Sequence, residues 1–275
     1  MEKIKFVEIQ NQRIAYSDDG EGDTIVLLHG ITYSRYSFRY NVPILSGLAR
    51  VICPDLPGHG LSAKPYFFDY TLSNQAKIVC EFCEKLGLKE IVLGGCSMGG
   101  AVAMQTAIDY PSLVSKLILV DSAGIDIDLK SPDSIFRLPI IGHFAAYLVA
   151  SGFAKSTRSR MENGLEGSPD EEFRAYLRES RRLSTMLASV RNLRTNNTFR
   201  VNGIDRIKQK TLVVWGEQDL LFSQRTAREI ARNIPDSRLV VLPDVGHLPN
   251  DEKPADFNQI VIDFLLDRIP EQIGT

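Results

Sequence analysis

The chain has 275 residues, of which 44% are hydrophobic and 24% charged, a balance typical of a globular protein with one sizeable core. Its formal net charge of -2 provides no basic excess for binding nucleic acid or an anionic membrane surface. Four cysteines include a single Cys-x-x-Cys pair, whereas a zinc site usually needs two. These features, with an N-terminus that lacks an apolar signal segment, predict a cytoplasmic protein.

In chain order, the first part of the sequence alternates between β-type runs and helical stretches. Two alternating segments predict an antiparallel pair, and later apolar runs predict buried strands with helices between them. Such an order favours a mostly parallel sheet covered by helices on both faces. The predicted strands are 4–10, 12–19, 24–30, 49–55, 90–95, 115–121, 211–216 and 238–242, and the predicted helices are 36–48, 73–86, 101–110, 224–233 and 254–269.

Between residues 123 and 205 the rhythm changes to a helical, Arg- and Ser-rich stretch without a strongly apolar β-type run. The sequence therefore predicts one core, formed by 1–122 and 206–275, that is interrupted by a helical insertion, 123–205. The long uncharged run 138–154 within the insertion is broken by Pro139, Gly142 and Gly152. We interpret it as a buried helix and expect no stable membrane insertion.

The sharpest motif is Gly95-Cys96-Ser97-Met98-Gly99, a G-x-S-x-G between a predicted buried strand and a predicted helix. In that context the glycines permit a tight strand-to-helix turn, which lifts the serine hydroxyl above the carboxyl edge of the sheet. The pattern predicts Ser97 as a nucleophile.

A serine nucleophile needs a base, and the base needs an acid that orients it. His247 directly follows the last predicted strand, so it is expected at the same sheet edge as Ser97. Asp219 follows the strand 211–216 and gives the chain order Ser, Asp, His. Asp121, which ends the strand 115–121, is the rival acid, and Asp244 is expected only to shape the histidine loop.

Hydrolysis also needs donors for the oxyanion of a tetrahedral intermediate. The backbone N–H of Met98, directly after the nucleophile, is one predicted donor. The second is predicted in the loop after strand 24–30, and Ile31 is its candidate residue. No metal or organic cofactor is expected.

The motifs together resemble those of α/β-hydrolase fold enzymes that consist of one core domain and a cap. This resemblance implies an eight-stranded, mostly parallel sheet with its second strand antiparallel, and makes 123–205 the cap (lid) over the pocket. Ser97 stands where dehalogenases and epoxide hydrolases of this fold carry aspartate, which argues against both. The matching stretches, in chain order, are LLHG, DLPGHGLSAKP, GGCSMGG, LILVDSAG, LVVWGEQD and VGHLPNDEKP.

We therefore expect a carboxylesterase-like serine hydrolase, monomeric or homodimeric, that acts on small to medium hydrophobic esters. The alternative on the same fold is a C–C bond hydrolase of meta-cleavage products, which the SMGG run also resembles. Those enzymes commonly carry an aromatic residue after the catalytic histidine, where this chain has Leu248. A second alternative is a slow-turnover protein that binds a small molecule. Cys96, before the nucleophile, is expected to be a packed residue.

Overall fold

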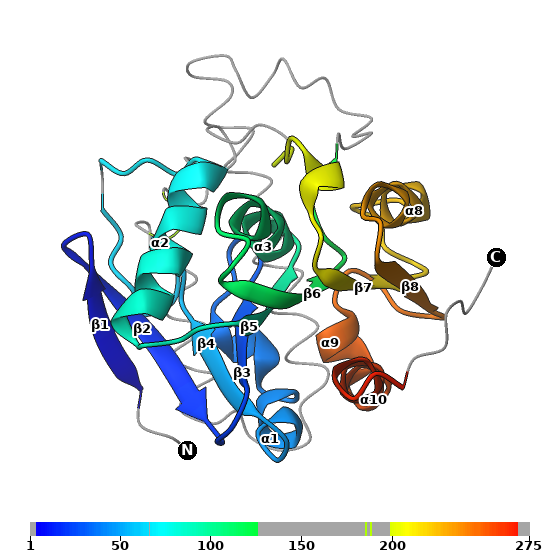
Figure 1. Ribbon diagram of the computed structural model, residues 1–275, viewed down its shortest axis with the longest axis horizontal. Helices are drawn as coiled ribbons and strands as arrows, with labels where there is room; N and C mark the ends of the chain where they lie inside the picture. Colours follow the sequence, from blue (N-terminus) through cyan, green and yellow to red (C-terminus); the bar gives the residue numbers. More distant parts are fainter. Residues whose placement is uncertain (1–3, 66, 126–184, 186–187, 189–198, 269–275) are drawn as a thin grey trace.

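The computed structural model describes residues 4–65, 67–125, 185, 188 and 199–268, and its centre is an eight-stranded sheet (Figure 1). The spatial order is β1-β2-β4-β3-β5-β6-β7-β8. β2 pairs antiparallel with both of its neighbours, and all other pairs are parallel. The strands are β1 (Lys5–Ile9), β2 (Gln12–Asp19), β3 (Thr24–Leu28), β4 (Arg50–Pro54), β5 (Ile91–Cys96), β6 (Val114–Val120), β7 (Lys210–Gly216) and β8 (Ser237–Leu242).

Helices cover both faces of this sheet, as Figure 1 shows. One face carries α2 (Leu72–Lys85), α3 (Met98–Asp109) and α8 (Gln224–Asn233). The opposite face carries α1 (Val42–Leu45), α9 (Pro249–Glu252) and α10 (Pro254–Leu265). Two short 3-10 turns, η1 (Arg35–Phe38) and η2 (Ile204–Arg206), complete the described elements. The expected architecture, an eight-stranded and mostly parallel sheet with its second strand antiparallel and helices on both faces, is confirmed.

Two hydrophobic clusters fill the spaces between the sheet and its two helix layers. Alternate residues of one strand enter opposite clusters: Val26 and Leu28 face α2 and α3, whereas Ile25 and Leu27 face the side of α10. All four are at most 3% exposed. Because both faces of the central strands are buried, these strands read as continuous apolar runs in the sequence.

The helix predicted over 73–86 is confirmed, with the Thr71 side chain accepting the Asn74 N–H at 3.3 Å as its N-cap. The helix predicted over 36–48 is wrong. The structure has only η1 and the four-residue α1 there, with Pro43 in the first turn of α1. Proline lacks a backbone N–H and is tolerated only in a first turn, so a continuous helix breaks before it.

The predicted cap, 123–205, lies mostly outside the described residues, and its helical character stays a prediction. From this interval the structure describes 123–125, 185, 188 and 199–205. Thr185 and Ala188 are helical and at most 1% exposed. Within the described part of the chain, no helix is long and apolar enough to cross a membrane.

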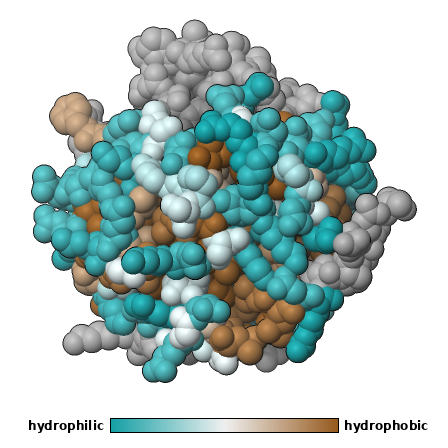
Figure 2. Space-filling model, viewed as in Figure 1, coloured by the Kyte–Doolittle hydropathy of each residue, from teal (hydrophilic) through white to brown (hydrophobic). Residues whose placement is uncertain are grey.

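The face seen in Figure 2 is mostly hydrophilic, with hydrophobic side chains gathered around α1 and α10. Ile44 and Leu48, in and just after α1, are 51% and 54% exposed. Folded proteins expose a good deal of apolar surface, so the patch by itself indicates no particular partner.

An ion-pair cluster ties the start of the sheet together and makes stability depend on pH. Hydrogen bonds from Arg50 and Lys5 lower the pKa of Asp18 from 3.8 to about 2, against the raising effect of burial. A carboxylate with a lowered folded-state pKa stabilises the fold above its unfolded pKa and loses that contribution as pH falls through the folded value. The stabilisation is therefore complete above about pH 4 and is lost toward about pH 2.

We expect Asp18→Asn to lower the free energy of unfolding by about 1–2 kcal/mol at pH 7, allowing for the partial exposure of both basic partners. The difference from the unmodified protein should shrink below about pH 4 and vanish only below about pH 2. Urea unfolding at several pH values measures it. Asp23→Asn is the matched control, because the Asp23 side chain has no polar partner within the described residues. An equal loss in both variants would contradict the assignment.

Candidate active site

Ser97 occupies the sharp turn between the end of β5 and the start of α3. Its backbone has φ 53° and ψ -117°, a conformation that costs a non-glycine residue about 1–3 kcal/mol. A side-chain carbon at Gly95 would lie 2.2 Å from Gly99 O, and one at Gly99 would lie 2.2 Å from Leu28 O. Both flanking glycines are therefore required by close backbone approach, which is the reason expected from the motif.

Backbone hydrogen bonds hold this turn in place. Ser97 N–H donates to Val120 O at 2.9 Å, and Ala123 N–H donates to Ser97 O at 3.1 Å. Ser97 is 9% exposed, and within the described residues no hydrogen bond involves its Oγ. The turn is fixed by the last residue of β6 and by the loop after it, while the hydroxyl is left available.

His247 and Asp219 form the ring–carboxylate pair of this sheet edge. His247 follows β8, Asp219 follows β7, and His247 Nδ1 lies 2.8 Å from Asp219 Oδ2. Asp219 Oδ1 also accepts the backbone N–H groups of Leu221 at 2.7 Å and Phe222 at 3.3 Å. With Nδ1 donating to a carboxylate, the Nε2 atom of the ring is the one that can accept a proton.

The His247 loop is held by Glu252, a residue that the sequence analysis did not identify. Its carboxylate accepts Gly246 N–H at 2.8 Å and Leu248 N–H at 3.2 Å, one on each side of the histidine. Glu252 ends the one-turn helix α9, which Pro249 begins. The sequence signal for this helix is Pro249, two residues after His247, because proline is common in the first turn of a helix.

Asp121, the rival acid, does not bond to His247. Its N–H donates to Val214 O at 3.0 Å, and its Oδ1 accepts the Gly216 N–H at 3.0 Å. The residue is fully buried beside Asp219. Burial, and then the negative charge of Asp219, raise the pKa of Asp121 well above its ordinary value. Of the two acids that the sequence offered, Asp219 is the one in contact with the imidazole ring.

Two further histidines are locked in non-titrating roles. His29 Nε2 accepts the Leu56 N–H at 2.9 Å, so its Nδ1 carries the proton and donates to Gly30 O at 2.7 Å. Burial lowers the pKa of His29 to about 4 and that of His59 to about 3, so both rings are neutral at pH 7. His143 lies outside the described residues.

The loop after β3 lies against the Ser97 turn. A side-chain carbon at Gly30 would lie 3.3 Å from Ser97 Cβ. Ile31 directly follows Gly30, and Met98 is the first residue of α3. Neither backbone N–H has a backbone acceptor within the part of the chain that the structure describes. Both predicted oxyanion donors thus flank the nucleophile turn with their amides unused.

Asp244 and Cys96 have the structural places expected for them. Asp244 takes a left-handed φ of 56° and accepts a hydrogen bond from Gln218 at 3.1 Å in the loop before His247. Cys96 is buried at the end of β5, and burial raises the pKa of its thiol well above the ordinary value. The Cys96 thiol is therefore neutral at physiological pH.

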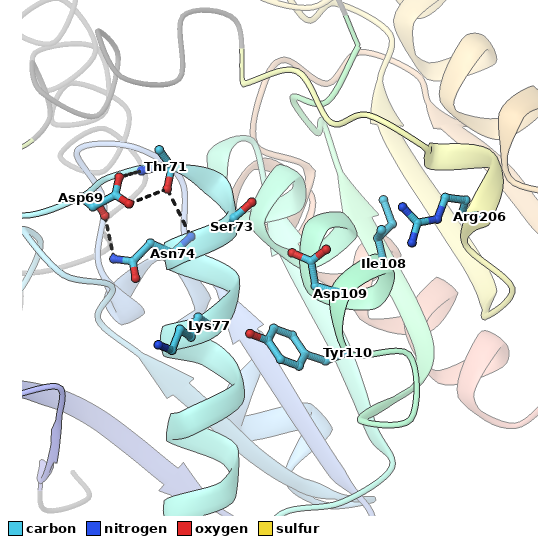
Figure 3. Close-up of a pocket in the computed structure, with 9 residues that line it drawn as sticks. All are labelled: Asp69, Thr71, Ser73, Asn74, Lys77, Ile108, Asp109, Tyr110 and Arg206. Atoms are coloured by element: carbon cyan, nitrogen blue, oxygen red, sulfur yellow. Dashed lines mark hydrogen bonds between the residues drawn. The ribbon is translucent and has the colours of Figure 1, made fainter.

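A cavity of about 530 Å³ lies away from these residues, over α2 and α3 (Figure 3). Side chains of both charges line it, among them Lys77, Asp109 and Arg206. Its upper rim contains the Asp69–Thr71 hydrogen bonds that begin α2. None of the residues of the candidate active site lines this cavity, so the cavity is not part of that site.

Known proteins similar to this chain include hydrolases of different kinds. A 30% identical relative, an uncharacterized hydrolase named YugF from Bacillus subtilis (strain 168), aligns with 91% of this chain and 92% of its own length. A 2-hydroxy-6-oxo-6-phenylhexa-2,4-dienoate hydrolase from Comamonas testosteroni is 28% identical, with 97% and 96% covered. A thermophilic esterase structure from Thermogutta terrifontis superposes with a TM-score of 0.77 at 26% identity, with 97% and 99% covered.

The family model described as alpha/beta hydrolase fold matches residues 23–254, which include every strand from β3 to β8 and all the residues of the candidate site. With this match, the chain belongs to the alpha/beta hydrolase fold family.

Proposed function

We propose that this protein is a serine hydrolase that cleaves carboxylic esters with a hydrophobic acyl or alkyl part. The observation that carries the proposal is the Ser97 hydroxyl, free of hydrogen bonds within the described residues, on a strained turn at the sheet edge that also carries the His247–Asp219 pair. Strain of this kind persists only where the surrounding structure imposes it, and it is concentrated at functional sites.

In the proposed reaction, His247 Nε2 takes the Ser97 proton while Oγ forms a bond to the ester carbonyl carbon. The carbonyl π electrons move to oxygen, and the Ile31 and Met98 N–H groups stabilise that oxyanion. Collapse breaks the bond to the alkoxy group, which leaves as the alcohol with the proton from His247. Water, deprotonated by His247, then attacks the acyl carbon. The bond between that carbon and Ser97 Oγ breaks, His247 returns its proton to Oγ, and the carboxylic acid is released.

Asp219 keeps the His247 ring in the tautomer that leaves Nε2 unprotonated, and it stabilises the imidazolium that forms in each half-reaction. Its own orientation is set by the Leu221 and Phe222 amides. Every step uses the side chains named, two backbone amides and water, so the proposed chemistry requires neither a metal ion nor an organic cofactor.

The second candidate is C–C bond hydrolysis of a meta-cleavage product. It is favoured by the 28% identity to the 2-hydroxy-6-oxo-6-phenylhexa-2,4-dienoate hydrolase. Leu248 weighs against it, because it replaces the aromatic residue that those enzymes commonly carry. Its side chain is 3% exposed and packs in the cluster of α10 with Val245 and Phe257.

Steady-state assays on both substrate classes test the proposal. We expect p-nitrophenyl esters of one favoured chain length to be cleaved with kcat/KM in the ordinary enzyme range, about 10⁴ M⁻¹s⁻¹ or more. We expect a fluorophosphonate to add once to the intact protein, as measured by mass spectrometry. Faster cleavage of a 2-hydroxy-6-oxo-dienoate would favour the second candidate. A protein that neither labels nor turns over but binds a small molecule tightly would contradict both.

A further inference from the structure

A second carboxyl group lies beside the His247–Asp219 pair, and the reaction proposed above gives it no task. One carboxylate oxygen each of Asp121 and Asp219 and one ring nitrogen of His247 lie within 4.8 Å of one another. Asp121 is fully buried, and its Oδ1 accepts the Gly216 N–H. Within the described residues its Oδ2 accepts no hydrogen bond. A buried anionic oxygen without a hydrogen-bond donor is strongly unfavourable, so an ionised Asp121 would be poorly accommodated.

The partners of the two acids determine which of them carries the charge. Asp219 has three donors, the His247 ring and two backbone amides, all suited to a carboxylate. Asp121 has one, from Gly216. Two adjacent carboxyl groups in a dry site do not both ionise, and the proton resides on the one with fewer donors. This assigns the proton to Asp121 and the negative charge to Asp219.

The other titratable groups around Asp121 act in the same direction. Besides burial and Asp219, the carboxylate of Glu252 on α9 raises the pKa of Asp121. The hydrogen bond from the Gly216 amide acts in the opposite direction. The Cys96 thiol on β5 is neutral, because burial, the largest cause, raises its pKa well above the ordinary value. His247 is turned toward Asp219, with its Nδ1 on that carboxylate.

We propose that Asp121 is a neutral positioning residue that donates a hydrogen bond from its Oδ2–H to the Asp219 carboxylate and so orients the acid that holds His247. The inference rests on the proposed function, in which Asp219 is the acid of the Ser97–His247 pair. The Gly216 and Val214 contacts fix Asp121 at a left-handed φ of 38°. The donated proton also withdraws charge from Asp219, which limits how strongly Asp219 favours the imidazolium form of His247.

Asp121→Asn tests the protonation state, because asparagine tolerates positive φ and places an N–H donor where the O–H is proposed. We expect the acidic limb of the kcat/KM profile to stay within about 0.3 pH unit of the unmodified protein. An ionised Asp121 predicts the opposite result, since removing a negative charge so close to the imidazole would move the limb downward by about 1 pH unit.

Asp121→Ala tests the donated hydrogen bond. Without the donor, the full charge of Asp219 should favour the imidazolium form of His247, so the acidic limb of the kcat/KM profile should move upward by about 0.5–1 pH unit. The orientation of the imidazole ring should also be less fixed, so kcat should fall about 10-fold at constant KM. Rescue of both changes in Asp121→Asn, with thermal unfolding as the check on folding, distinguishes positioning from a merely structural role. An unmoved limb in a folded Asp121→Ala would overturn the proposal.

A readout without turnover separates this inference from the proposed function. The His247 ring proton can be titrated by NMR in the Ser97→Ala background, with His247→Gln to assign the signal. The midpoint should be unmoved by Asp121→Asn and raised by Asp121→Ala, whatever the activity of the enzyme. If no ester is hydrolysed, the proposed function fails while this titration still decides the state of Asp121. A lowered midpoint in Asp121→Asn overturns it even if Asp121→Ala does not fold.

Discussion

Ser97→Ala is expected to lower kcat for the best ester substrate by about 10⁵–10⁶ and to abolish the fluorophosphonate adduct. The variant removes the only atom that is proposed to bond to the acyl carbon, so no acyl-enzyme forms. The Ile31 and Met98 amides remain, and they would account for a residual rate of about 10³–10⁴ over the uncatalysed reaction. Burst kinetics with p-nitrophenyl esters and intact-mass spectrometry measure both effects.

Ser73→Ala is the matched control for Ser97→Ala. Ser73 lies on α2 and lines the cavity in Figure 3, which contains none of the residues proposed to act in catalysis. This control should keep full turnover and one adduct. If Ser97→Ala still gave a stoichiometric adduct, the nucleophile would be another residue and the proposed mechanism would be wrong.

His247→Ala is expected to produce a loss of similar size, about 10⁵–10⁶ in kcat, because a serine hydroxyl without a general base is a weak nucleophile. The fluorophosphonate labelling rate should fall with it. His29 and His59 offer no substitute base, since both are fully buried and hydrogen-bonded to backbone groups. Parallel kcat and labelling measurements check the prediction.

Two comparisons sharpen the His247 result. Asp219→Asn should cost less, about 10⁴ in kcat, because the base remains and only its tautomer and orientation suffer. The double variant Ser97→Ala/His247→Ala should be no slower than either single variant, since residues that act as one unit are not additive. A His247→Ala enzyme that kept more than a tenth of the activity would place the base elsewhere.

Most of the fold follows from residue patterns along the chain. Continuous apolar runs predicted the central strands because a parallel sheet buries both faces of each strand. The G-x-S-x-G between a strand and a helix predicted the Ser97 turn because only glycine fits where backbones approach as closely as Gly95 and Gly99 do. The chain order favoured Asp219 over Asp121. The helical pattern of 36–48 does not by itself show the break before Pro43, which depends on the missing N–H of proline.

The carboxyl group that holds the imidazole ring, and the contacts around it, are established by folding and not by residue order alone. Asp121 and Asp219 follow adjacent parallel strands, so sequence position brings both to the same edge. The choice depends on backbone conformation: Asp121 turns at φ 38° and its Oδ1 takes the Gly216 amide, while the loop after β7 directs Asp219 toward the ring. The Glu252 contacts on either side of His247 likewise arise only after folding. Such contacts depend on loop dihedrals and on the packing of elements distant in the chain, which residue patterns do not encode.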